Sequence, residues 1–149
     1  MNFNGGKSFD DRGSLTYFNE FSPIEMNIKR FYIVENFAAG MVRAWHGHKN
    51  EDKWVTCISG AAIIGYVPSL ELCYGEVVSK VCDIQRTVLN ANSPQLIYLS
   101  KGGYNGAKSL LPETRLLYFS TSTLEESKVD DYRLAWDYFG EEVWKVENR

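Results

Sequence analysis

The sequence predicts an all-β domain, an antiparallel sandwich or barrel, and three observations lead to that prediction. The apolar segments are short and recur at roughly ten-residue spacing, with turn residues between them. Aromatic residues make up 14% of the 149-residue chain, a composition that favours strands. No segment between residues 28 and 122 keeps a helical period over the length of a helix. We therefore expect one β domain over residues 1–149, because a chain of this length can bury a core without disulfides.

The expected strands can be placed in order along the chain. They are the apolar segments at 28–35, 40–48, 53–59, 61–67, 77–84, 86–90, 95–100 and 115–122. Ser59-Gly60 separates the third segment from the fourth and predicts a tight β-hairpin between them. The chain after residue 122 is charged and aromatic, and Trp136 and Trp144 are expected to hold a C-terminal helix or irregular arm across the sheet.

The charge of the chain limits its partners. The net charge is −3, and acidic and basic residues are interspersed along the sequence. This pattern argues against a nucleic-acid partner, because nucleic-acid surfaces normally show a basic excess. A small anionic ligand is still compatible with it, since two or three local arginines can hold a phosphate group whatever the total charge.

Neither the membrane nor the secretory route is indicated by the sequence. No apolar run is long enough to cross a bilayer, and residues 1–12 lack the apolar core of a signal peptide. We therefore expect a cytoplasmic protein with no membrane partner. The three cysteines, Cys57, Cys73 and Cys82, show no CxxC spacing, which predicts buried free thiols rather than a disulfide framework or a zinc site.

The two histidines of the chain lie together in the segment RAWHGHKNEDKW, residues 43–54. On a regular strand, residues two apart share a face, so His46 and His48 would project together. Arg43, Trp45 and Gly47 would then point to the opposite face, unless a β-bulge changes the alternation.

Three interpretations of this pair are open on these grounds. They can be two surface histidines, metal ligands or proton carriers. His-x-His followed by Asp52 resembles the first motif of metal-binding cupins, and two imidazoles with one carboxylate can bind iron. A proton carrier is favoured by the reference pKa of histidine, about 6.5. The nearby Lys53 would stabilise the negative charge that forms when a carbon acid loses its proton, and a tyrosine could return that proton.

Four segments, taken in order, resemble the sugar-nucleotide cupins. They are DDRGSLTYFNEF (10–21), IKRFYIVEN (28–36), VRAWHGHK (42–49) and KWV (53–55). The dTDP-4-dehydrorhamnose 3,5-epimerase family carries D-x-RG, then RGxHxQ, then KLV, and later GFAHGF and a strand that ends in a tyrosine. IYLSKGGYNGAKSL (97–110) is similar to the GFAHGF region, and ETRLLYFST (113–121) is similar to the tyrosine strand. The resemblance spans residues 10–145.

The resemblance implies a role for each matching residue. His46 matches the general base that removes the proton next to the 4-keto group, Lys53 the lysine that stabilises the enolate, and Tyr118 the tyrosine that delivers a proton from the opposite face. Arg12 and Arg43 match arginines that bind the nucleotide diphosphate, a group that suits a bidentate guanidinium.

Some positions depart from the epimerase pattern. His48 stands where the family has glutamine, and it is expected to act as the partner of His46 or as a second proton carrier. Asn105 replaces the histidine of GFAHGF and is expected to support the enolate or contact substrate. The family's aspartate that orients the base has no evident counterpart, and Glu51, Asp52 and Asp137 are candidates to replace it.

A second group of enzymes resembles the first two-thirds of the chain. The dTDP-4-keto-6-deoxyglucose 3,4-ketoisomerases carry IKR-x-Y and RGxHAHK, which resemble IKRFY and RAWHGHK here, and this likeness adds Tyr32 as a candidate site residue. The C-terminal sequence favours the epimerase branch instead. Both groups enolise a ketone at C4 of a nucleotide-linked sugar.

The resemblance therefore implies a cupin jelly roll (double-stranded β-helix) with a short C-terminal aromatic tail or helix. It implies an epimerase acting on a nucleotide-linked 4-keto-6-deoxy sugar by enolisation next to the C4 ketone, in deoxysugar biosynthesis for surface polysaccharide. No metal and no other cofactor is implied, and a homodimer is expected. A 3,4-ketoisomerase of the same substrate class and a non-catalytic sugar-nucleotide-binding cupin are the alternatives.

Overall fold

The computed structural model describes residues 1–68, 72–73, 76–77 and 83–149. Most of the strand expected at 77–84 lies outside the described residues, as does Cys82. Cys57 is a free, buried thiol, as predicted. Among the described residues, no helix is long and apolar enough to cross a membrane.

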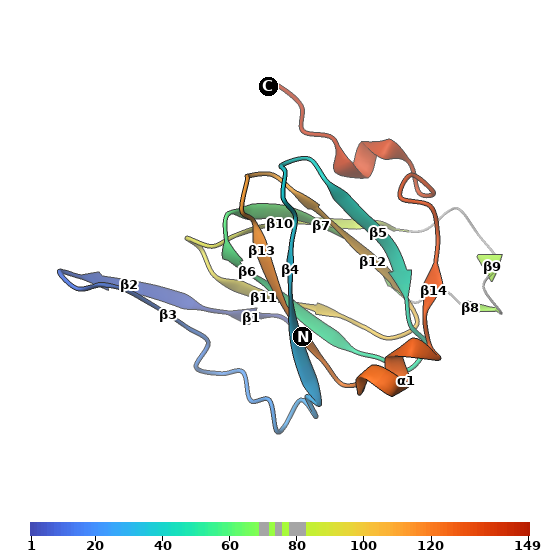
Figure 1. Ribbon diagram of the computed structural model, residues 1–149, viewed down its shortest axis with the longest axis horizontal. Coiled ribbons are helices and arrows are strands. Elements are labelled where there is room, and N and C mark those ends of the chain that lie inside the picture. Colours follow the sequence, from blue (N-terminus) through green and yellow to red (C-terminus); the bar gives the residue numbers. More distant parts are fainter. Residues whose placement is uncertain (69–71, 74–75, 78–82) are drawn as a thin grey trace.

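Two five-stranded antiparallel sheets face each other, which confirms the predicted all-β jelly roll (Figure 1). The first sheet has, in order, β1 (Phe3–Asn4), β11 (Gln95–Leu99), β6 (Lys53–Ser59), β13 (Arg115–Ser120) and β4 (Arg30–Glu35). The second has β10 (Gln85–Asn90), β7 (Ala61–Val67), β12 (Tyr104–Ser109), β5 (Val42–Gly47) and β14 (Tyr132–Arg133). Two small pairs, β2 (Gly6–Asp10) with β3 (Gly13–Tyr17) and β8 (Leu72–Cys73) with β9 (Glu76–Val77), complete the strands.

The main core fills the space between the two sheets. Strand β7 is buried on both faces, which explains why its sequence is an unbroken apolar run. Ile64 and Tyr66 point into the core between the sheets, whereas Ile63 and Val67 belong to a second apolar cluster on the outer side. That second cluster is covered by the C-terminal tail.

The prediction of a hairpin at Ser59-Gly60 is wrong. Both flanking strands have the predicted bounds, but β6 belongs to the first sheet and β7 to the second. Gly60 has a φ of 75°, and a Cβ there would lie 2.5 Å from the Thr114 hydroxyl, which accepts from the Ala61 amide at 3.4 Å. The tight turn therefore carries the chain across the core from one sheet to the other.

Strand β5 contains an irregularity that decides which of its side chains face the core. Asn105 of β12 pairs with His46, but Ala107, two residues on, pairs with Arg43, three residues back. β5 thus carries one extra residue, and Gly106 accommodates it because a Cβ at Gly106 would lie 2.3 Å from the Cβ of Ala44. The expectation that Arg43 points away from the histidines is therefore wrong, because the bulge restores Arg43 to their face.

The C-terminal tail is a series of short elements rather than one helix. It contains α1 (Leu124–Lys128), then β14, and then a 3₁₀ turn, η1 (Glu141–Trp144). Thr123 and Glu126 form a capping box at the start of α1. Trp144 is buried, and its indole nitrogen donates to the Trp136 carbonyl oxygen at 2.9 Å. Trp144 anchors the tail as predicted, whereas Trp136 is 44% exposed and does not.

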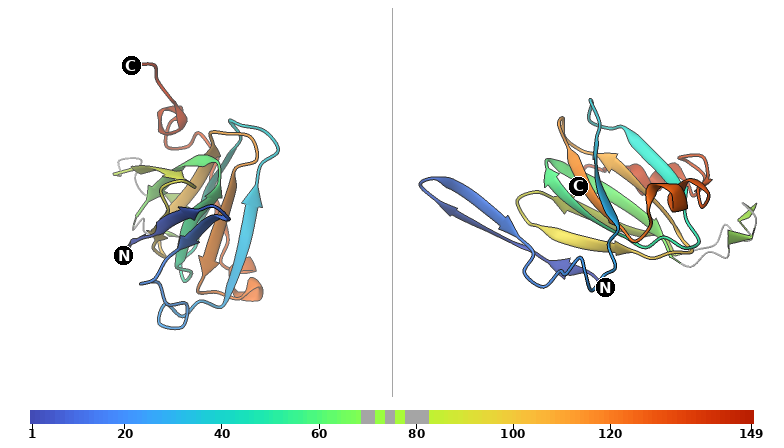
Figure 2. Two further views of the ribbon diagram at one scale, coloured as in Figure 1. Left: turned by 90° about the vertical axis from the view of Figure 1, so that its left-hand side faces the viewer. Right: turned by 60° about the horizontal axis from the view of Figure 1, so that its bottom comes forward.

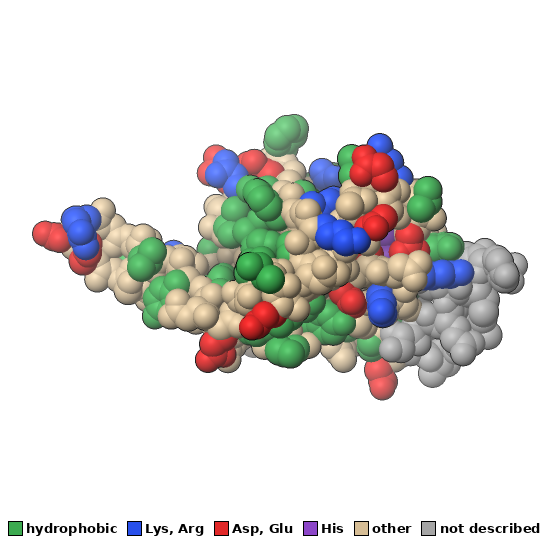
Figure 3. Space-filling view, turned by 90° about the horizontal axis from the view of Figure 1, so that it is seen from below, with side chains coloured by type: hydrophobic (Ala, Val, Ile, Leu, Met, Phe, Trp, Pro, Cys, Tyr) green, Lys and Arg blue, Asp and Glu red, His purple; other side chains and the backbone are tan. Residues whose placement is uncertain are grey.

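The β2–β3 hairpin projects away from the sandwich (Figures 1 and 2). Both strands expose large apolar side chains: Phe9 of β2 is 72% exposed and Leu15 of β3 is 63% exposed. Figure 3 shows charged side chains gathered at the tip of this arm and apolar ones along it.

Candidate active site

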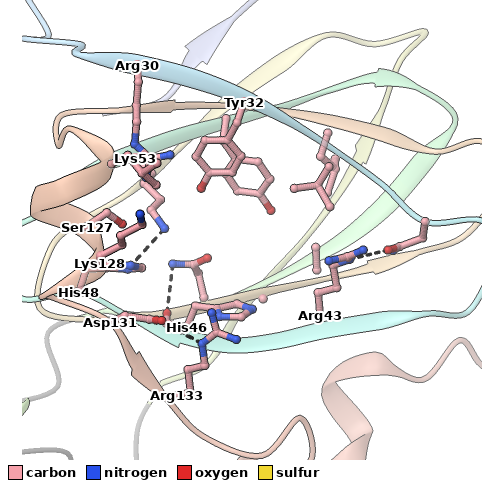
Figure 4. Close-up of a pocket in the computed structure, with 18 of the residues that line it drawn as sticks. Arg30, Tyr32, Arg43, His46, His48, Lys53, Ser127, Lys128, Asp131 and Arg133 are labelled. Carbon is pink, nitrogen blue, oxygen red and sulfur yellow. Dashed lines mark hydrogen bonds and ion pairs between the residues drawn. The ribbon is translucent and has the colours of Figure 1, made fainter.

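A cavity of about 300 Å³ opens between the two sheets, at the end where β14 and α1 lie (Figure 4). Its walls come from β4, β6 and β13 of the first sheet and from β5 and β12 of the second, with α1 and β14 beside the opening. Strands that alternate in and out supply one inward side chain at every second position, so several strands can aim polar groups into one space.

Seven of the eight predicted site residues line this cavity. They are Tyr32, Arg43, His46, His48, Lys53, Asn105 and Tyr118. Arg12 is the exception, since it lies at the tip of the β2–β3 hairpin, where its side chain is 85% exposed and pairs with Asp10. The prediction that Arg12 lies with the other site residues is therefore wrong for the cavity of its own chain. The interpretation of His46 and His48 as surface histidines is also wrong, because both line the cavity and His48 is buried.

His46 projects from β5 and is half-buried. Burial is the main cause that lowers its pKa below 6.5, and the positive charge of Arg133 lowers it further. No described residue forms a hydrogen bond with its ring nitrogens, and Asn105 contacts only its backbone, donating to the carbonyl oxygen at 3.3 Å. His46 is therefore a neutral imidazole with a free nitrogen at neutral pH, which is the state that a general base requires.

His48 has a different environment, because each ring nitrogen lies beside a charged side chain. Nε2 is 3.2 Å from a carboxylate oxygen of Glu51, and Nδ1 is 3.4 Å from Nζ of Lys53. Burial, followed by the charge of Lys53, lowers the pKa of His48 to about 4. Burial also lowers the pKa of Lys53, against the opposing effect of Glu51.

The rings of Tyr32 and Tyr118 form the wall on the side of the first sheet. They stack with centroids 5.1 Å apart and planes 7° apart, and the guanidinium of Arg30 lies 4.8 Å from the Tyr32 centroid. Burial raises the pKa of both tyrosines well above 10. Both hydroxyls therefore keep their protons at neutral pH and can act as acids.

Arg43 is held at the other end of the cavity by a chain of side chains. Its Nε donates to the Asn36 side-chain oxygen at 2.7 Å, and the Asn36 amide donates to the Ser109 hydroxyl at 2.6 Å. Since only Nε is used by Asn36, the terminal nitrogens of the guanidinium are left to bind an anionic group in the cavity.

The cavity is more basic than the chain as a whole. Among the described residues that line it, five are Lys or Arg and one is acidic, although the net charge of the chain is −3; the five are Arg30, Arg43, Lys53, Lys128 and Arg133. Arg30, Lys128, Arg133 and the acidic residue, Asp131, were not predicted. Asp131 and Arg133 pair at 3.1 Å and reach the cavity because β14 adds to the edge of β5, with Arg133 opposite His46. In the sequence they stand in the charged segment DDYR (residues 130–133), and nothing local shows which strand this segment joins.

The carboxylates proposed as partners for the histidines take different places. Glu51 contacts His48 rather than His46. Asp52 accepts from the Tyr98 hydroxyl at 2.7 Å and from the Lys101 amide at 2.8 Å, and neither Asp52 nor Asp137 lines the cavity. The alternative metal site of His46, His48 and Asp52 is therefore not formed, and the described residues hold no group of three His, Cys, Asp or Glu side chains suited to a metal ion.

Comparisons with known proteins support the same fold. The family described as WxcM-like, C-terminal (FdtA) matches residues 6–143. No curated protein matches the chain significantly. Among solved structures, the dTDP-4-dehydrorhamnose 3,5-epimerase of Bacillus anthracis, solved with TDP and PPi, superposes with a TM-score of 0.72 at 21% identity, over 99% of this chain and 85% of that one.

Ketoisomerases are similar in fold as well. A 3,4-ketoisomerase from Helicobacter canadensis gives a TM-score of 0.66 at 20% identity, over 96% of each chain. A mutant of the 3,4-ketoisomerase QdtA from Thermoanaerobacterium thermosaccharolyticum, solved with TDP-4-keto-6-deoxyglucose, gives 0.65 at 19% identity, over 96% of this chain and 92% of that one. The resemblance to both groups that the sequence predicted is confirmed at the level of fold, and the chain belongs to the WxcM-like, C-terminal (FdtA) family.

Proposed function

We propose that this protein is an epimerase that acts on a nucleotide-linked 4-keto-6-deoxy sugar by enolisation next to the C4 ketone. The observation that carries the proposal is the placement of a neutral histidine, whose ring forms no hydrogen bond with any described residue, and a protonated tyrosine on opposite walls of one basic cavity. His46 comes from the second sheet and Tyr118 from the first. A sugar ring bound between them presents one face to each group.

The proposed reaction begins with proton removal from carbon. A hydrogen on the carbon next to C4 is acidic because the negative charge that remains moves onto the ketone oxygen. His46 takes this proton as an imidazole, and the ammonium of Lys53 stabilises the enolate oxygen. Asn105, opposite His46 on β12, supplies a further polar group to the same region.

Inversion follows when the proton returns from the other face. Tyr118 donates its hydroxyl proton to the carbon, and the enolate electrons re-form the ketone. The buried hydroxyl of Tyr118 stays protonated until this step. The proton on His46 and the missing proton on Tyr118 are then restored by exchange with water, so the step needs no metal or redox cofactor.

We assign Arg43 to the diphosphate of the substrate, because a guanidinium with free terminal nitrogens can bind two phosphate oxygens at once. Arg12 is too far out on the hairpin arm to reach the cavity of its own chain. We propose a homodimer in which the exposed apolar side chains of this arm are covered by a second copy and Arg12 approaches the partner's cavity. Light scattering of the purified protein tests this association, and a monomer would contradict it.

A 3,4-ketoisomerase is the second candidate, and one observation favours it. Tyr32 stacks on Tyr118 and lines the same cavity, so a second acid is available for moving protons between C3 and C4. The contacts of His48 do not support its expected role as partner of His46, because its two ring nitrogens lie beside Glu51 and Lys53. The same contacts leave neither nitrogen free for the role of second proton carrier.

The test is incubation of dTDP-4-keto-6-deoxyglucose with the protein in deuterated water, followed by NMR. An epimerase places deuterium at C3 or C5 with inverted configuration. A ketoisomerase moves the ketone from C4 to C3. Binding without any deuterium uptake would contradict the proposal and select the non-catalytic sugar-nucleotide-binding cupin.

A further inference from the structure

Glu51 lies in the loop between β5 and β6 and is the most enclosed charged group beside the cavity. Its side chain is completely buried, although its sequence neighbours Asn50 and Asp52 are polar. The Ser120 hydroxyl donates to one carboxylate oxygen at 2.5 Å, and the Ser127 hydroxyl donates to the other at 2.9 Å. Arg30 adds a third donor at 3.2 Å. A buried carboxylate with this many donors is fixed in position and direction.

The carboxylate is ionised despite its burial. Burial alone would raise the pKa of Glu51, but Lys53, the Ser120 hydroxyl and His48 outweigh burial and lower the pKa below 4.5. An ionised carboxylate can only accept hydrogen bonds, so the ring nitrogen of His48 that faces it must carry a proton. That nitrogen is Nε2, at 3.2 Å.

The other ring nitrogen of His48 faces a cation. Lys53 Nζ lies 3.4 Å from Nδ1, and an ammonium can only donate. A neutral ring that is protonated at Nε2 satisfies both neighbours. The opposite tautomer places a lone pair against the carboxylate and a proton against the ammonium, and a charged ring repels Lys53.

We propose that Glu51 and His48 are positioning residues that act through Lys53, and that His48 carries no proton in the reaction. Glu51 selects the tautomer of His48, and His48 then presents a lone pair that holds the Lys53 ammonium in the cavity beside the place assigned to the enolate oxygen. This inference rests on the proposed function for the role of Lys53. The tautomer itself does not depend on that function.

The contrast with His46 supports this division of roles. His46 has no hydrogen bond to its ring from any described residue and is half-buried, whereas His48 is 7% exposed and is held on both sides. A group that must take a proton from substrate needs a free nitrogen, and a group that must hold a neighbour needs an occupied one. Of the two histidines in the segment RAWHGHK, His46 is therefore suited to act as the base and His48 to position Lys53.

The tautomer is measured on the unliganded protein by two-bond proton–nitrogen correlation of nitrogen-15-labelled histidine. The chain holds two histidines, so a spectrum of His46→Asn assigns the signals of the other. We expect His48 to show a protonated Nε2 and an unprotonated Nδ1 at pH 7. A ring protonated at Nδ1, or a charged ring at pH 7, would overturn the inference whatever the substrate turns out to be.

The role through Lys53 is measured by kinetics on dTDP-4-keto-6-deoxyglucose. His48→Leu removes the acceptor, so Lys53 is no longer held in place, and kcat should fall by about 10- to 100-fold with KM nearly unchanged. His48→Asn keeps an acceptor near the Nδ1 position but cannot titrate, and it should recover kcat to within about tenfold of wild type. A proton-carrying His48 predicts instead that His48→Asn loses as much as His46→Asn, about 10² to 10⁴. Circular dichroism confirms that each variant is folded.

The pH profile of kcat for Glu51→Gln distinguishes a positioning role from a purely structural one, because a purely structural role would not shift its alkaline limb. The groups that face Lys53 are His48, Glu51, Arg30, Asp130 and Asp131, and Glu51 is the largest of the influences that raise its pKa. Without that charge the pKa of Lys53 falls, so the loss of kcat on the alkaline side should move to lower pH. An unshifted alkaline limb in a folded Glu51→Gln protein would contradict the role of Glu51. Absence of any turnover by wild-type protein would contradict the proposed function and leave the tautomer result standing.

Discussion

Tyr32 and Tyr118 stack face to face across the pairing of β4 with β13, with ring centroids 5.1 Å apart and planes 7° apart. They are directly opposite residues in the register of these two strands, and both side chains point into the cavity. Two acids are thus presented side by side on the wall that faces His46. The proposed epimerase uses Tyr118, and a ketoisomerase would add Tyr32.

Replacing each tyrosine by phenylalanine separates these roles. Tyr118→Phe removes the acid on the far face, so inversion should fall by about 10²-fold or more. His46 can still remove and return a proton on its own face, so deuterium exchange with retained configuration should persist. Tyr32→Phe keeps the ring that stacks on Tyr118 and should cost less than about tenfold.

NMR of the sugar product after incubation in deuterated water measures both exchange and inversion. The reverse order, with Tyr32→Phe the more damaging variant, would select the ketoisomerase.

The acid limb of the pH profile reports the protonation of His46. Burial and then Arg133 lower its pKa from 6.5, and a protonated imidazole cannot accept a proton. Activity should therefore be complete at neutral pH and be lost only as pH falls through a value below 6.5. Arg133→Gln removes a positive charge opposite His46, so the pKa should rise and the acid limb of kcat/KM should move to higher pH.

Arg115→Gln is a matched control, because Arg115 also pairs with a carboxylate, Glu35, but does not line the cavity. Its profile should coincide with that of wild type. An acid limb that Arg133→Gln leaves in place would show that another group controls it.

Stability should also depend on pH through His48. The folded state holds its pKa at about 4, whereas the unfolded chain has about 6.5, so the unfolded state binds more protons between these values. The contribution of His48 to the free energy of unfolding should be complete above pH 6.5. It should fall as pH drops from 6.5 toward 4, by up to about 1.4 kcal/mol per pH unit. Lys53, Glu51, Asp130 and Asp131 face this ring and share in the effect.

Urea unfolding of wild type and His48→Gln at pH 7 and pH 5 measures this loss of stability. The variant should lose less stability than wild type over that interval, and equal losses would contradict the pKa shift of His48.

The bulge in β5 depends on a close approach between Gly106 and Ala44. A Cβ at position 106 would lie 2.3 Å from the Cβ of Ala44, so Gly106→Ala should destabilise the protein by about 1–3 kcal/mol. Ala44→Gly removes the atom that clashes, and the double variant Ala44→Gly/Gly106→Ala should regain part of the loss. Thermal unfolding of the four proteins of this cycle measures the coupling, and strictly additive effects would show that the two positions do not interact.

The sequence predicted the sandwich well because its strands are marked by local patterns. The bounds of β6 and β7 match the predicted segments at both ends. Their pairing could not be predicted, since β7 is buried on both faces and its apolar run does not show which neighbour it contacts. The hairpin expected at Ser59-Gly60 failed for that reason. A two-residue turn can close a hairpin or cross between sheets, and the Thr114 hydroxyl that supports this crossing is distant in sequence.

The candidate site was predicted where residue order was enough and missed where tertiary structure was needed. His46 and Lys53 come from strands with clear local patterns, and the resemblance named them correctly as cavity residues. The resemblance also named Arg43 correctly, but the alternation of a regular strand placed its side chain on the wrong face, because the bulge opposite Gly106 is a feature of two strands rather than one. Asp131 and Arg133 required the docking of β14 on β5, which the DDYR segment alone does not reveal.

The most direct test of the account compares wild type with His46→Asn in deuterated water, with dTDP-4-keto-6-deoxyglucose as substrate. Wild type should place deuterium on a carbon next to the ketone, and the folded variant should do so about 10² to 10⁴ times more slowly while binding the sugar nucleotide with similar affinity. Deuterium uptake by His46→Asn at the rate of wild type would contradict the central claim.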